Sequence, residues 1–411
     1  MPESFVIVGA GLAGGTAATT LRQDGFDGRV ILIGAEPCPP YERPPLSKEY
    51  LRGESSFEQA LFQPLDFYGE NGIELRSDAR ATRIDVRKKT VELDSGEYVA
   101  YDRLLFAAGV KNRHVPTPGS DLDGIYDLHT VADCDLIRRE VSPGRKAVVV
   151  GMGFIGSEVA ASLRQSGVEV TVVDRNKVPL RRVLGEEVGR VMEGIHRDHG
   201  TELIFEDTVA AFEGARRVES VTTRTGRRLG CDFVVVALGI EPAAEPLTGT
   251  GVKIDNGVVV DEYCRTDVEG IYAAGDVANH YHPVFGRHIR VEHWQNALKH
   301  GQAAARSMLG DGQPYQEIPW FWSDQYEHNL QYAGFHRDWD ELVVRGSMEK
   351  RSFVAFYRKD ERVLAAVAFD RGRDLRRSVP LIKARQRIEA SRLRDPDVDL
   401  QTLVTAADTR L

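Results

Sequence analysis

The sequence predicts an α/β protein in which one strand–turn–helix unit occurs twice, followed by a smaller α+β region. The first observation is an apolar run at residues 5–8 that ends in a G-x-G-x-x-G turn. The second is the return of the same pattern at Lys146. The third is a change in the last quarter of the chain, where short alternating apolar runs replace it.

The first apolar run is too short for a helix and suits a buried parallel strand. After it, Gly9 permits a tight turn, Gly11 lets the backbone approach a diphosphate, and Gly14 lets helix and strand pack closely. The helix N-terminus that follows favours an anion through its unpaired N–H groups and dipole. A second strand, residues 29–34, leads to Glu36, which is placed to bind ribose hydroxyls.

The second unit repeats this order of features. An apolar run at residues 147–150 precedes a second G-x-G-x-x-G, a helix is expected from Ser157 to Gln165, and the next strand ends at Asp174. The glycines of this turn are Gly151, Gly153 and Gly156. Two dinucleotide-binding motifs in one chain indicate an internal repeat.

Three later apolar strands end in small residues. The runs ending at Gly109 and Gly239 have the same Ala-x-Gly or Ala-Gly ending, and a third ends in Gly275-Asp276. A carboxylate at the C-terminal edge of such a strand faces the ligand crevice of an open α/β sheet. The alternative for Asp276 is that it caps the next helix.

A proline-rich segment, residues 37–48, follows Glu36. Its prolines are expected to prevent a helix until about Leu46. Arg43 and Lys48 can fold back from this segment over a bound dinucleotide. Alternatively, the segment is a surface loop with two solvated cations.

Composition predicts a soluble globular protein of two to four domains. The 411 residues are 42% hydrophobic and 28% charged, and the net charge of -9 argues against nucleic acid or an anionic membrane as the main partner. The four scattered cysteines form no C-x-x-C, which excludes a clustered zinc site or a C-x-x-C redox pair and suggests a reducing compartment. No apolar run is long enough to span a bilayer, and the first strand begins too early to leave room for a signal peptide, so we expect a cytoplasmic protein.

The last quarter of the chain predicts hairpin strands followed by a helix. The expected strands are Leu330 to Ala333, Leu342 to Arg345, Ser352 to Tyr357 and Val363 to Phe369. Pro380 is expected to open a basic helix that runs to about Leu393.

The order of these motifs resembles that of the FAD-dependent pyridine nucleotide-disulfide oxidoreductases. The segments Tyr41-Glu-Arg-Pro-Pro-Leu-Ser-Lys48 and Phe321-Trp-Ser-Asp-Gln-Tyr326 make the resemblance closest to the NADH:ferredoxin and rubredoxin reductases of aromatic-ring dioxygenase and cytochrome P450 systems. The resemblance implies a glutathione-reductase-like architecture with two Rossmann-like domains. The implied domains are FAD-binding (1–112 and 243–317), NAD-binding (113–242) and C-terminal α+β (318–411).

The resemblance also implies which residues bind each cofactor. FAD, expected to be noncovalent, would be bound by Gly9, Gly11, Leu12, Ala13, Gly14, Glu36, Arg43, Lys48, Thr82, Ala107, Gly109, Asp276, Val277 and Trp294. NAD would be bound by Gly151, Gly153, Phe154, Ile155, Gly156, Glu158, Asp174 and Gly239.

Lys48, Glu158 and Trp322 are the implied catalytic residues. Lys48 would stabilise negative charge on the reduced flavin. Glu158 would pair with Lys48 and reach the nicotinamide amide, and Trp322 would lie near the nicotinamide. The alternatives are a favourable acid in a first helical turn for Glu158 and ordinary core packing for Trp322.

The chain departs from several relatives at the position of a catalytic thiol. Related NADH oxidases, NADH peroxidases and coenzyme A-disulfide reductases have a cysteine soon after the ribose-binding acid, where this chain has Arg43 to Ser47. Cys38 comes earlier than that nucleophile and is interpreted as structural.

The resemblance implies an NADH-dependent enzyme that passes electrons singly to a ferredoxin or rubredoxin serving an oxygenase. The alternatives are a reductase of a small acceptor, such as an ascorbate radical or a quinone, and a redox-switched binding protein like apoptosis-inducing factor. The oligomeric state stays open. Asp174 favours NADH over NADPH, although nearby cations could bind a 2′-phosphate: Arg175, Lys177, Arg181 and Arg182.

A basic cluster in the C-terminal region is a candidate docking surface for the acidic protein acceptor. Only Asp374 and Glu389 oppose it, and the alternative is a solvated helix face. The cluster comprises Arg371, Arg373, Arg376, Arg377, Lys383, Arg385, Arg387 and Arg392.

Overall fold

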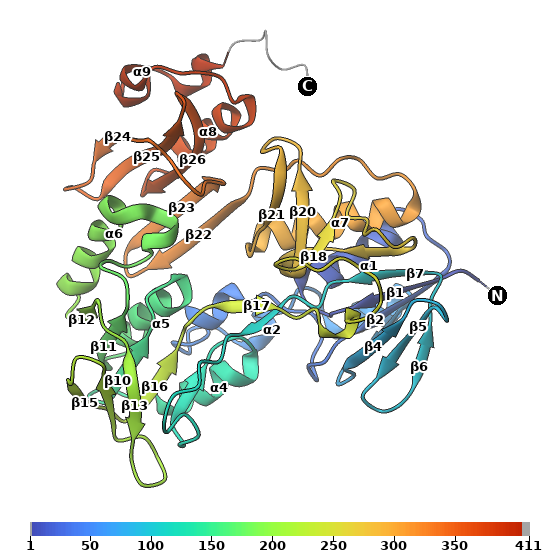
Figure 1. The fold of residues 1–411 in the computed structure, drawn as a ribbon, viewed down its shortest axis with the longest axis horizontal. Coiled ribbons are helices and arrows are strands. Elements are labelled where there is room, and N and C mark those ends of the chain that lie inside the picture. Colours follow the sequence, from blue (N-terminus) through green and yellow to red (C-terminus); the bar gives the residue numbers. More distant parts are fainter. Residues whose placement is uncertain (1, 405–411) are drawn as a thin grey trace. The chain divides into compact units, whose positions relative to one another are not determined.

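The computed structural model describes residues 2–404, which form two compact units (Figure 1). Unit 1 comprises residues 1–42, 57–111 and 240–319, and unit 2 comprises residues 43–56, 112–239 and 320–411. Residues 1 and 405–411 of the predicted domains lie outside the described part of the chain.

Unit 1 contains a five-stranded parallel sheet in the order β19-β7-β1-β2-β3. Its strands are β1 (Ser4–Val8), β2 (Arg29–Ile33), β3 (Ile73–Arg76), β7 (Arg103–Phe106) and β19 (Ile271–Ala273). Helices α1 (Leu12–Gln23) and α7 (Trp294–Leu309) pack against each other. They approach closely because Gly301 has no side chain: a Cβ there would lie 2.4 Å from the carbonyl oxygen of Ala13.

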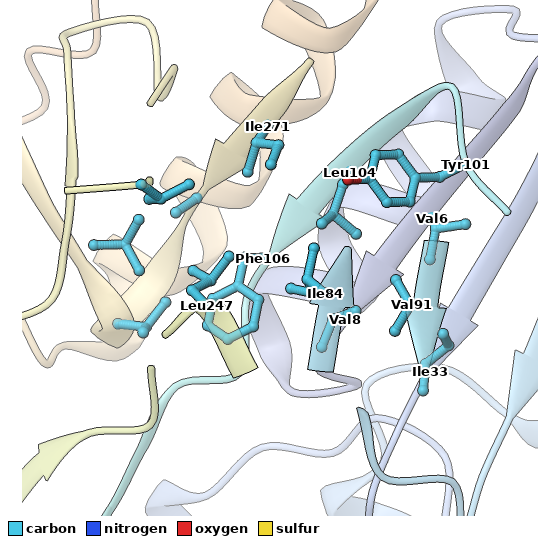
Figure 2. Close-up of a cluster of buried hydrophobic side chains, with 14 of the residues drawn as sticks. Val6, Val8, Ile33, Ile84, Val91, Tyr101, Leu104, Phe106, Leu247 and Ile271 are labelled. Atoms are coloured by element: carbon cyan, nitrogen blue, oxygen red, sulfur yellow. The ribbon is translucent and has the colours of Figure 1, made fainter. Parts of the chain in front are cut away.

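The central strands of unit 1 are buried on both faces. In β1, Val6 and Val8 belong to one apolar cluster, while Phe5 and Ile7 belong to another. This alternation between two buried faces is expected of a parallel strand covered on both sides. Figure 2 shows the first cluster, in which sheet residues meet Ile84 and Val91.

Unit 2 repeats this sheet in the order β12-β11-β10-β16-β9. Its strands are β9 (Ile125–Asp127), β10 (Lys146–Val150), β11 (Glu169–Asp174), β12 (Glu202–Phe205) and β16 (Phe233–Val236). The strand at the end of the sheet next to β7 or β16 differs in origin. In unit 1 it is β19, far downstream of the other four strands, and in unit 2 it is β9, upstream of them. The helix after the glycine turn is α5 (Phe154–Gln165).

Each repeat also contains a three-stranded antiparallel sheet, inserted between β3 and β7 in unit 1 and between β12 and β16 in unit 2. These sheets are β4 (Ala81–Asp85), β5 (Thr90–Leu93) and β6 (Tyr98–Ala100) in unit 1, and β13 (Val209–Glu213), β14 (Ser220–Thr223) and β15 (Arg228–Gly230) in unit 2. The internal repeat predicted from the glycine motifs is therefore confirmed in strand order, direction and insertion.

The last part of unit 2 is an antiparallel sheet in the order β22-β23-β26-β25-β24, with two helices after it. Its elements are β22 (Trp320–Gln325), β23 (His328–Gly334), β24 (Glu341–Ser347), β25 (Ser352–Lys359), β26 (Arg362–Phe369), α8 (Gly372–Ala384), α9 (Ala390–Arg394) and η4 (Leu400–Leu403). The four predicted hairpin strands are confirmed. Strand β22 was not among the predicted strands, although its residues 321–325 belong to a motif that supports the resemblance.

The predicted helix from Pro380 to about Leu393 is wrong. Pro380 lies inside α8, at an exposed position where water can replace the backbone hydrogen bond that proline cannot make. The helix packs Leu375, Leu381 and Ile382 inward and ends at Ala384, and the C-cap residue Arg385 has a left-handed φ of 51°. Pro380 therefore lies in the interior of α8 and not in its first turn.

Two helix starts also lie earlier than expected. The proline-rich segment forms a 3-10 turn, η1 (Pro44–Ser47), because prolines fit the first turn of a helix, where their missing N–H is not needed. Helix α5 begins at Phe154 rather than Ser157. Glu158 therefore lies in its second turn, and the alternative of a first-turn acid is wrong.

The remaining elements are α2 (Phe57–Ala60), α3 (Leu65–Glu70), β8 (Val110–Asn112), α4 (Val131–Glu140), α6 (Arg181–Asp198), β17 (Ile240–Pro242), η2 (Glu245–Leu247), β18 (Val258–Val260), η3 (Gly275–Val277), β20 (Ala278–His282) and β21 (Arg287–Arg290). They include a three-stranded sheet, β18-β20-β21, and a two-stranded sheet, β17-β8. Among residues 2–404, no helix is both long and apolar enough to cross a bilayer.

Candidate functional site: two glycine turns and a buried ion pair

In unit 1, the turn between β1 and α1 requires glycine at two positions and leaves the third open. Gly9 has φ 112°, and a Cβ there would lie 2.2 Å from the carbonyl oxygen of Ala107. A Cβ on Gly14 would lie 1.9 Å from the carbonyl oxygen of Gly9. Gly11 has nothing within 4 Å of its Cβ position and is the N-cap residue of α1, which has no side-chain cap. The open space at Gly11 and the uncapped N–H groups fit a diphosphate.

In unit 2, the turn between β10 and α5 has the same construction. Gly151 has φ 96°, with a Cβ position 2.4 Å from the carbonyl oxygen of Ala237, and the Cβ position of Gly156 is 2.0 Å from the carbonyl oxygen of Gly151. Gly153 has nothing within 4 Å of its Cβ position and is the N-cap residue of α5, which has no side-chain cap. The chain therefore has two equivalent anion cradles, one in each unit.

Two apolar side chains are exposed in the segments that follow β10 and β16 of unit 2. Ile155 is 44% exposed and Leu238 is 39% exposed, which is unusual for large apolar residues. Leu238 lies next to the turn, since its Cδ2 is 3.6 Å from the Cβ position of Gly151. Exposed apolar surface at an anion cradle suits a nucleotide that has both a diphosphate and flat rings.

Glu36 follows β2, and Asp174 is the last residue of β11, at the strand ends where they were predicted. The Oε2 atom of Glu36 accepts a 2.6 Å hydrogen bond from the hydroxyl of Tyr41. Asp174 is buried, and its Oδ2 accepts a 2.6 Å bond from the backbone N–H of Met152 inside the glycine turn. Its Oδ1 accepts from the backbone N–H of Asn176, also at 2.6 Å. Asp174 thus fastens the turn in addition to its predicted role towards ribose.

Lys48 and Glu158 form the buried ion pair expected from their predicted roles. Lys48 Nζ lies 2.6 Å from Glu158 Oε2, and Lys48 also donates to the carbonyl oxygen of Pro44 at 3.2 Å. Two serines complete the environment of the carboxylate: Ser47 donates to Oε2 at 2.5 Å and Ser323 donates to Oε1 at 2.6 Å. Glu158 therefore accepts from one ammonium and two hydroxyls.

Trp322 lies on strand β22 of the C-terminal sheet, next in sequence to Ser323, which bonds Glu158. Strand β22 alternates, with Phe321, Ser323 and Gln325 buried and Trp320 and Trp322 on its other face. The two indoles stack with ring centroids 5.4 Å apart. This arrangement does not match the alternative of Trp322 as ordinary core, since Trp322 is only partly buried.

Other predicted residues lie at several places in the two units. In unit 2, Arg43 donates to the carbonyl oxygen of His129. Phe154 lies within the glycine motif as the first residue of α5, and Gly239 lies in the segment after β16. In unit 1, Leu12 and Ala13 lie in the first turn of α1, while Ala107 and Gly109 follow β7. Asp276 and Val277 form η3 after β19. Thr82 is exposed on β4, and its hydroxyl donates to the carbonyl oxygen of Glu92 at 3.2 Å.

Trp294 begins α7, as predicted, and this helix start has no side-chain cap. A neighbouring carboxyl group, Glu42, has its pKa raised by burial, while a hydrogen bond with the Trp294 indole opposes that shift. An uncapped helix start at this position favours developing negative charge.

The three buried cysteines are unsuited to thiolate chemistry. Burial raises the pKa of Cys134 to about 12 and that of Cys231 to about 11, and it raises the pKa of Cys264 well above its ordinary value. The Cys134 thiol instead donates to the carbonyl oxygen of Leu46 at 3.1 Å. Cys38 is half-buried and lies outside any secondary-structure element.

Ser47 and Ser323 were not predicted as partners of Glu158. Both serines lie in the motifs Leu46-Ser47-Lys48 and Trp322-Ser323-Asp324. The alternation of β22 was the available signal, because a serine between two buried side chains on an inward face needs a hydrogen-bond partner.

Residues 3–301 match the family described as pyridine nucleotide-disulphide oxidoreductase, and residues 320–404 match the one described as reductase C-terminal. The chain belongs to the pyridine nucleotide-disulphide oxidoreductase family.

Within this family the chain is similar to reductases of electron-transfer proteins. It is 36% identical to rhodocoxin reductase of Rhodococcus erythropolis over 402 residues, covering 98% of this chain and 94% of that protein. It is 33% identical to putidaredoxin reductase of Pseudomonas putida, covering 100% and 98%. The crystal structure of the covalent putidaredoxin reductase–putidaredoxin complex superposes with a TM-score of 0.95, covering 99% of each chain.

Proposed function

We propose that this protein is an FAD-dependent, NADH-oxidising reductase that passes electrons singly to a small iron–sulfur protein, a ferredoxin or rubredoxin serving an oxygenase. The observation that supports it most is the pair of equivalent glycine turns, each open at its middle glycine. One chain can thereby hold two dinucleotides. The similarity to rhodocoxin and putidaredoxin reductases supports the kind of acceptor.

The overall reaction converts one NADH and two oxidised acceptors into NAD⁺, one proton and two reduced acceptors. When bound, FAD supplies the step from two-electron to one-electron chemistry, and the protein supplies position and electrostatics. In this proposal the turn at Gly11 binds the diphosphate of FAD and Glu36 binds its ribose. The turn at Gly153 and Asp174 bind NADH.

Lys48 and Glu158 act together in the proposed mechanism. The ammonium of Lys48 stabilises negative charge that develops on the flavin, and the carboxylate of Glu158 holds that ammonium in place. Trp322, partly buried on β22, positions the nicotinamide. In this proposal no thiol takes part: burial raises the pKa of each of the three buried cysteines, and Cys38 comes earlier in the sequence than the catalytic thiol of related enzymes.

A cytoplasmic location is part of the proposal. Three buried cysteine thiols suit a reducing compartment. Separating cell fractions and probing each with an antibody to this protein tests the location directly.

The acceptor class is tested by NADH-driven reduction of cytochrome c with and without an added iron–sulfur protein. We expect rapid reduction only when a ferredoxin or rubredoxin is present. Fast turnover with a quinone or an ascorbate radical, and no stimulation by iron–sulfur proteins, would instead support a small-molecule reductase. Slow turnover with every acceptor would support a redox-switched binding protein.

A further inference from the structure

A chain of buried hydrogen bonds runs from Glu158 to helix α6 within unit 2. Ser323 donates to Glu158 Oε1 at 2.6 Å, Gln325 Nε2 donates to Ser323 Oγ at 3.0 Å, and His196 Nε2 lies 2.9 Å from Gln325 Oε1. All four residues are buried, and none of them is more than 4% exposed as a whole residue. The three links join residues from α5, β22 and α6.

The donors of this chain all point towards Glu158. The hydroxyl proton of Ser323 is used on the carboxylate, so the Ser323 oxygen accepts from the amide of Gln325. The Gln325 oxygen then faces His196, which must donate from Nε2. The other ring nitrogen of His196 is left to accept from the hydroxyl of Tyr326 at 3.3 Å.

We propose that His196 is a positioning residue for Glu158. By donating to Gln325, it fixes the orientation of that amide, the direction of the Ser323 hydroxyl, and through them the carboxylate that holds Lys48. The inference rests on the proposed role of Glu158 in NADH oxidation. His196 itself acts on Glu158 only through Gln325 and Ser323.

The charge states around His196 keep this direction constant near neutral pH. Burial lowers the pKa of His196 to about 4, so the ring is neutral and has one N–H. The pKa of Tyr326 is raised to about 12 by burial, so its hydroxyl stays protonated. The tautomer of His196 is therefore set by its two neighbours rather than by solvent.

The experiment compares His196→Leu, which removes the donor, with His196→Gln, whose amide nitrogen can donate from a similar position. Ser323→Ala breaks the chain next to Glu158. For each FAD-loaded variant we would measure the rate of flavin reduction by NADH, the dissociation constant of NAD⁺ and the midpoint potential of the flavin. His336→Leu is the matched control, since His336 is a histidine of the same unit that hydrogen-bonds Tyr332 outside the chain.

Ser323→Ala is expected to slow flavin reduction by about tenfold or more, the scale of a lost hydrogen bond to a charged group. His196→Leu is expected to slow it by about three- to tenfold on the same scale and to shift the midpoint potential in the same direction as Ser323→Ala. His196→Gln should restore both. In the Ser323→Ala background, His196→Leu should slow flavin reduction by less than about a further twofold, because the effects of substitutions within one hydrogen-bond network are not additive.

Two outcomes separate failure of this inference from failure of the proposed function. If Glu158→Gln does not slow flavin reduction, the proposed role of Glu158 is wrong, and the inference fails with it. If Glu158→Gln slows reduction but the effects of His196→Leu and Ser323→Ala multiply, or His336→Leu has the same effect as His196→Leu, then His196 acts only on stability and the inference is overturned.

Discussion

Lys48 Nζ and Glu158 Oε2 lie 2.6 Å apart although 110 residues separate them in the sequence. Only 8% and 5% of the two side chains are exposed. At such burial each charge depends on the other, because neither can be solvated by water. The effects of replacing Lys48 and Glu158 on the free energy of unfolding should therefore be strongly coupled.

Removing one member of the pair should be worse than removing both. Lys48→Met or Glu158→Leu alone is expected to lower the free energy of unfolding by about 3–5 kcal/mol, since each leaves a buried charge without its partner. The double variant should recover most of that loss. Urea unfolding of the four proteins measures the coupling, and simple addition of the two losses would show that the pair is solvated in solution.

Asp174 should determine the preference for NADH. A carboxylate here accepts from a ribose 2′-hydroxyl and repels a 2′-phosphate, so kcat/KM is expected to be higher with NADH. Asp174→Asn should reduce the ratio of the two kcat/KM values by roughly tenfold, because the repulsion is lost while the amide oxygen can still accept from Met152.

Asp207→Asn is a suitable control for that experiment. Asp207 is another buried carboxylate of unit 2, and it accepts from the backbone N–H groups of Thr208 and Thr225. Equal kcat/KM values with NADH and NADPH in the unmodified enzyme would contradict the prediction, and the exposed cations Arg175 and Lys177 would then be the first candidates for a phosphate site.

Replacing every thiol should leave flavin reduction nearly unchanged. We expect Cys38→Ser combined with alanine at Cys134, Cys231 and Cys264 to keep the rate within about tenfold, or roughly 1.4 kcal/mol of barrier. Alanine is chosen at the buried positions because a serine hydroxyl there would lack solvent. A loss of several orders of magnitude in a folded, FAD-loaded variant would show that a thiol participates.

Stability should fall as the pH is lowered below about 6.5. Burial lowers the pKa of His300 to about 3 and that of His280 well below its ordinary value. Below pH 6.5 the unfolded chain binds protons at these histidines while the folded chain does not, so acid favours unfolding. Above pH 6.5 both states are neutral there and this contribution is fully present. For each pH unit below 6.5, each of these histidines lowers the free energy of unfolding by up to about 1.4 kcal/mol.

His300→Asn tests this dependence. The asparagine oxygen can still accept from the backbone N–H of Gly275, which bonds His300 Nδ1 at 3.3 Å, but the side chain cannot be protonated. Between pH 5 and pH 7 the variant should lose less stability than the unmodified protein in urea unfolding. The exposed His288 is the control, and an equal flattening in His288→Asn would refute the assignment to burial.

Part of the basic cluster should attract the protein acceptor. The structure pairs Arg371 with Asp374 and Arg377 with Asp399, but leaves Arg373, Arg376 and Lys383 exposed on α8. These three positions recur at helical spacing and form one stripe. Changing all three to Glu should raise the KM for the iron–sulfur protein and flatten its dependence on salt, because steering by charge is screened over about 8–10 Å.

A charge-matched variant distinguishes a docking surface from net charge. Arg83, Arg87 and Lys88 are exposed in and after β4, and changing them to Glu alters the net charge of the protein equally. Reduction of ferricyanide should be unaffected in both variants. If the two variants shift the acceptor KM equally, the stripe on α8 has no special role.

The repeated sheet could be predicted because its signals are local. An apolar run, three glycines and an acid at the end of the next strand occur within about thirty residues, and each has one structural meaning. The end of α8 could not be predicted in this way. Pro380 is compatible with a first turn and with an exposed interior position, and only packing of Leu375 and Leu381 beneath it selects the second.

The surroundings of Glu158 show the same limit for the site. Pairing with Lys48 followed from the resemblance, but Ser323, Gln325 and His196 come from elements that meet only in the folded unit. Serine, glutamine and histidine are common on protein surfaces, so their types give no signal. Their shared burial is visible only in three dimensions.

The division of the chain between the two units has a practical consequence. The backbone passes from one unit to the other five times, after residues 42, 56, 111, 239 and 319. Neither unit is therefore a continuous stretch that can be expressed by truncating the gene at one end. A single protease cut in any of these connections should leave both fragments associated under native conditions and separate them only in denaturant.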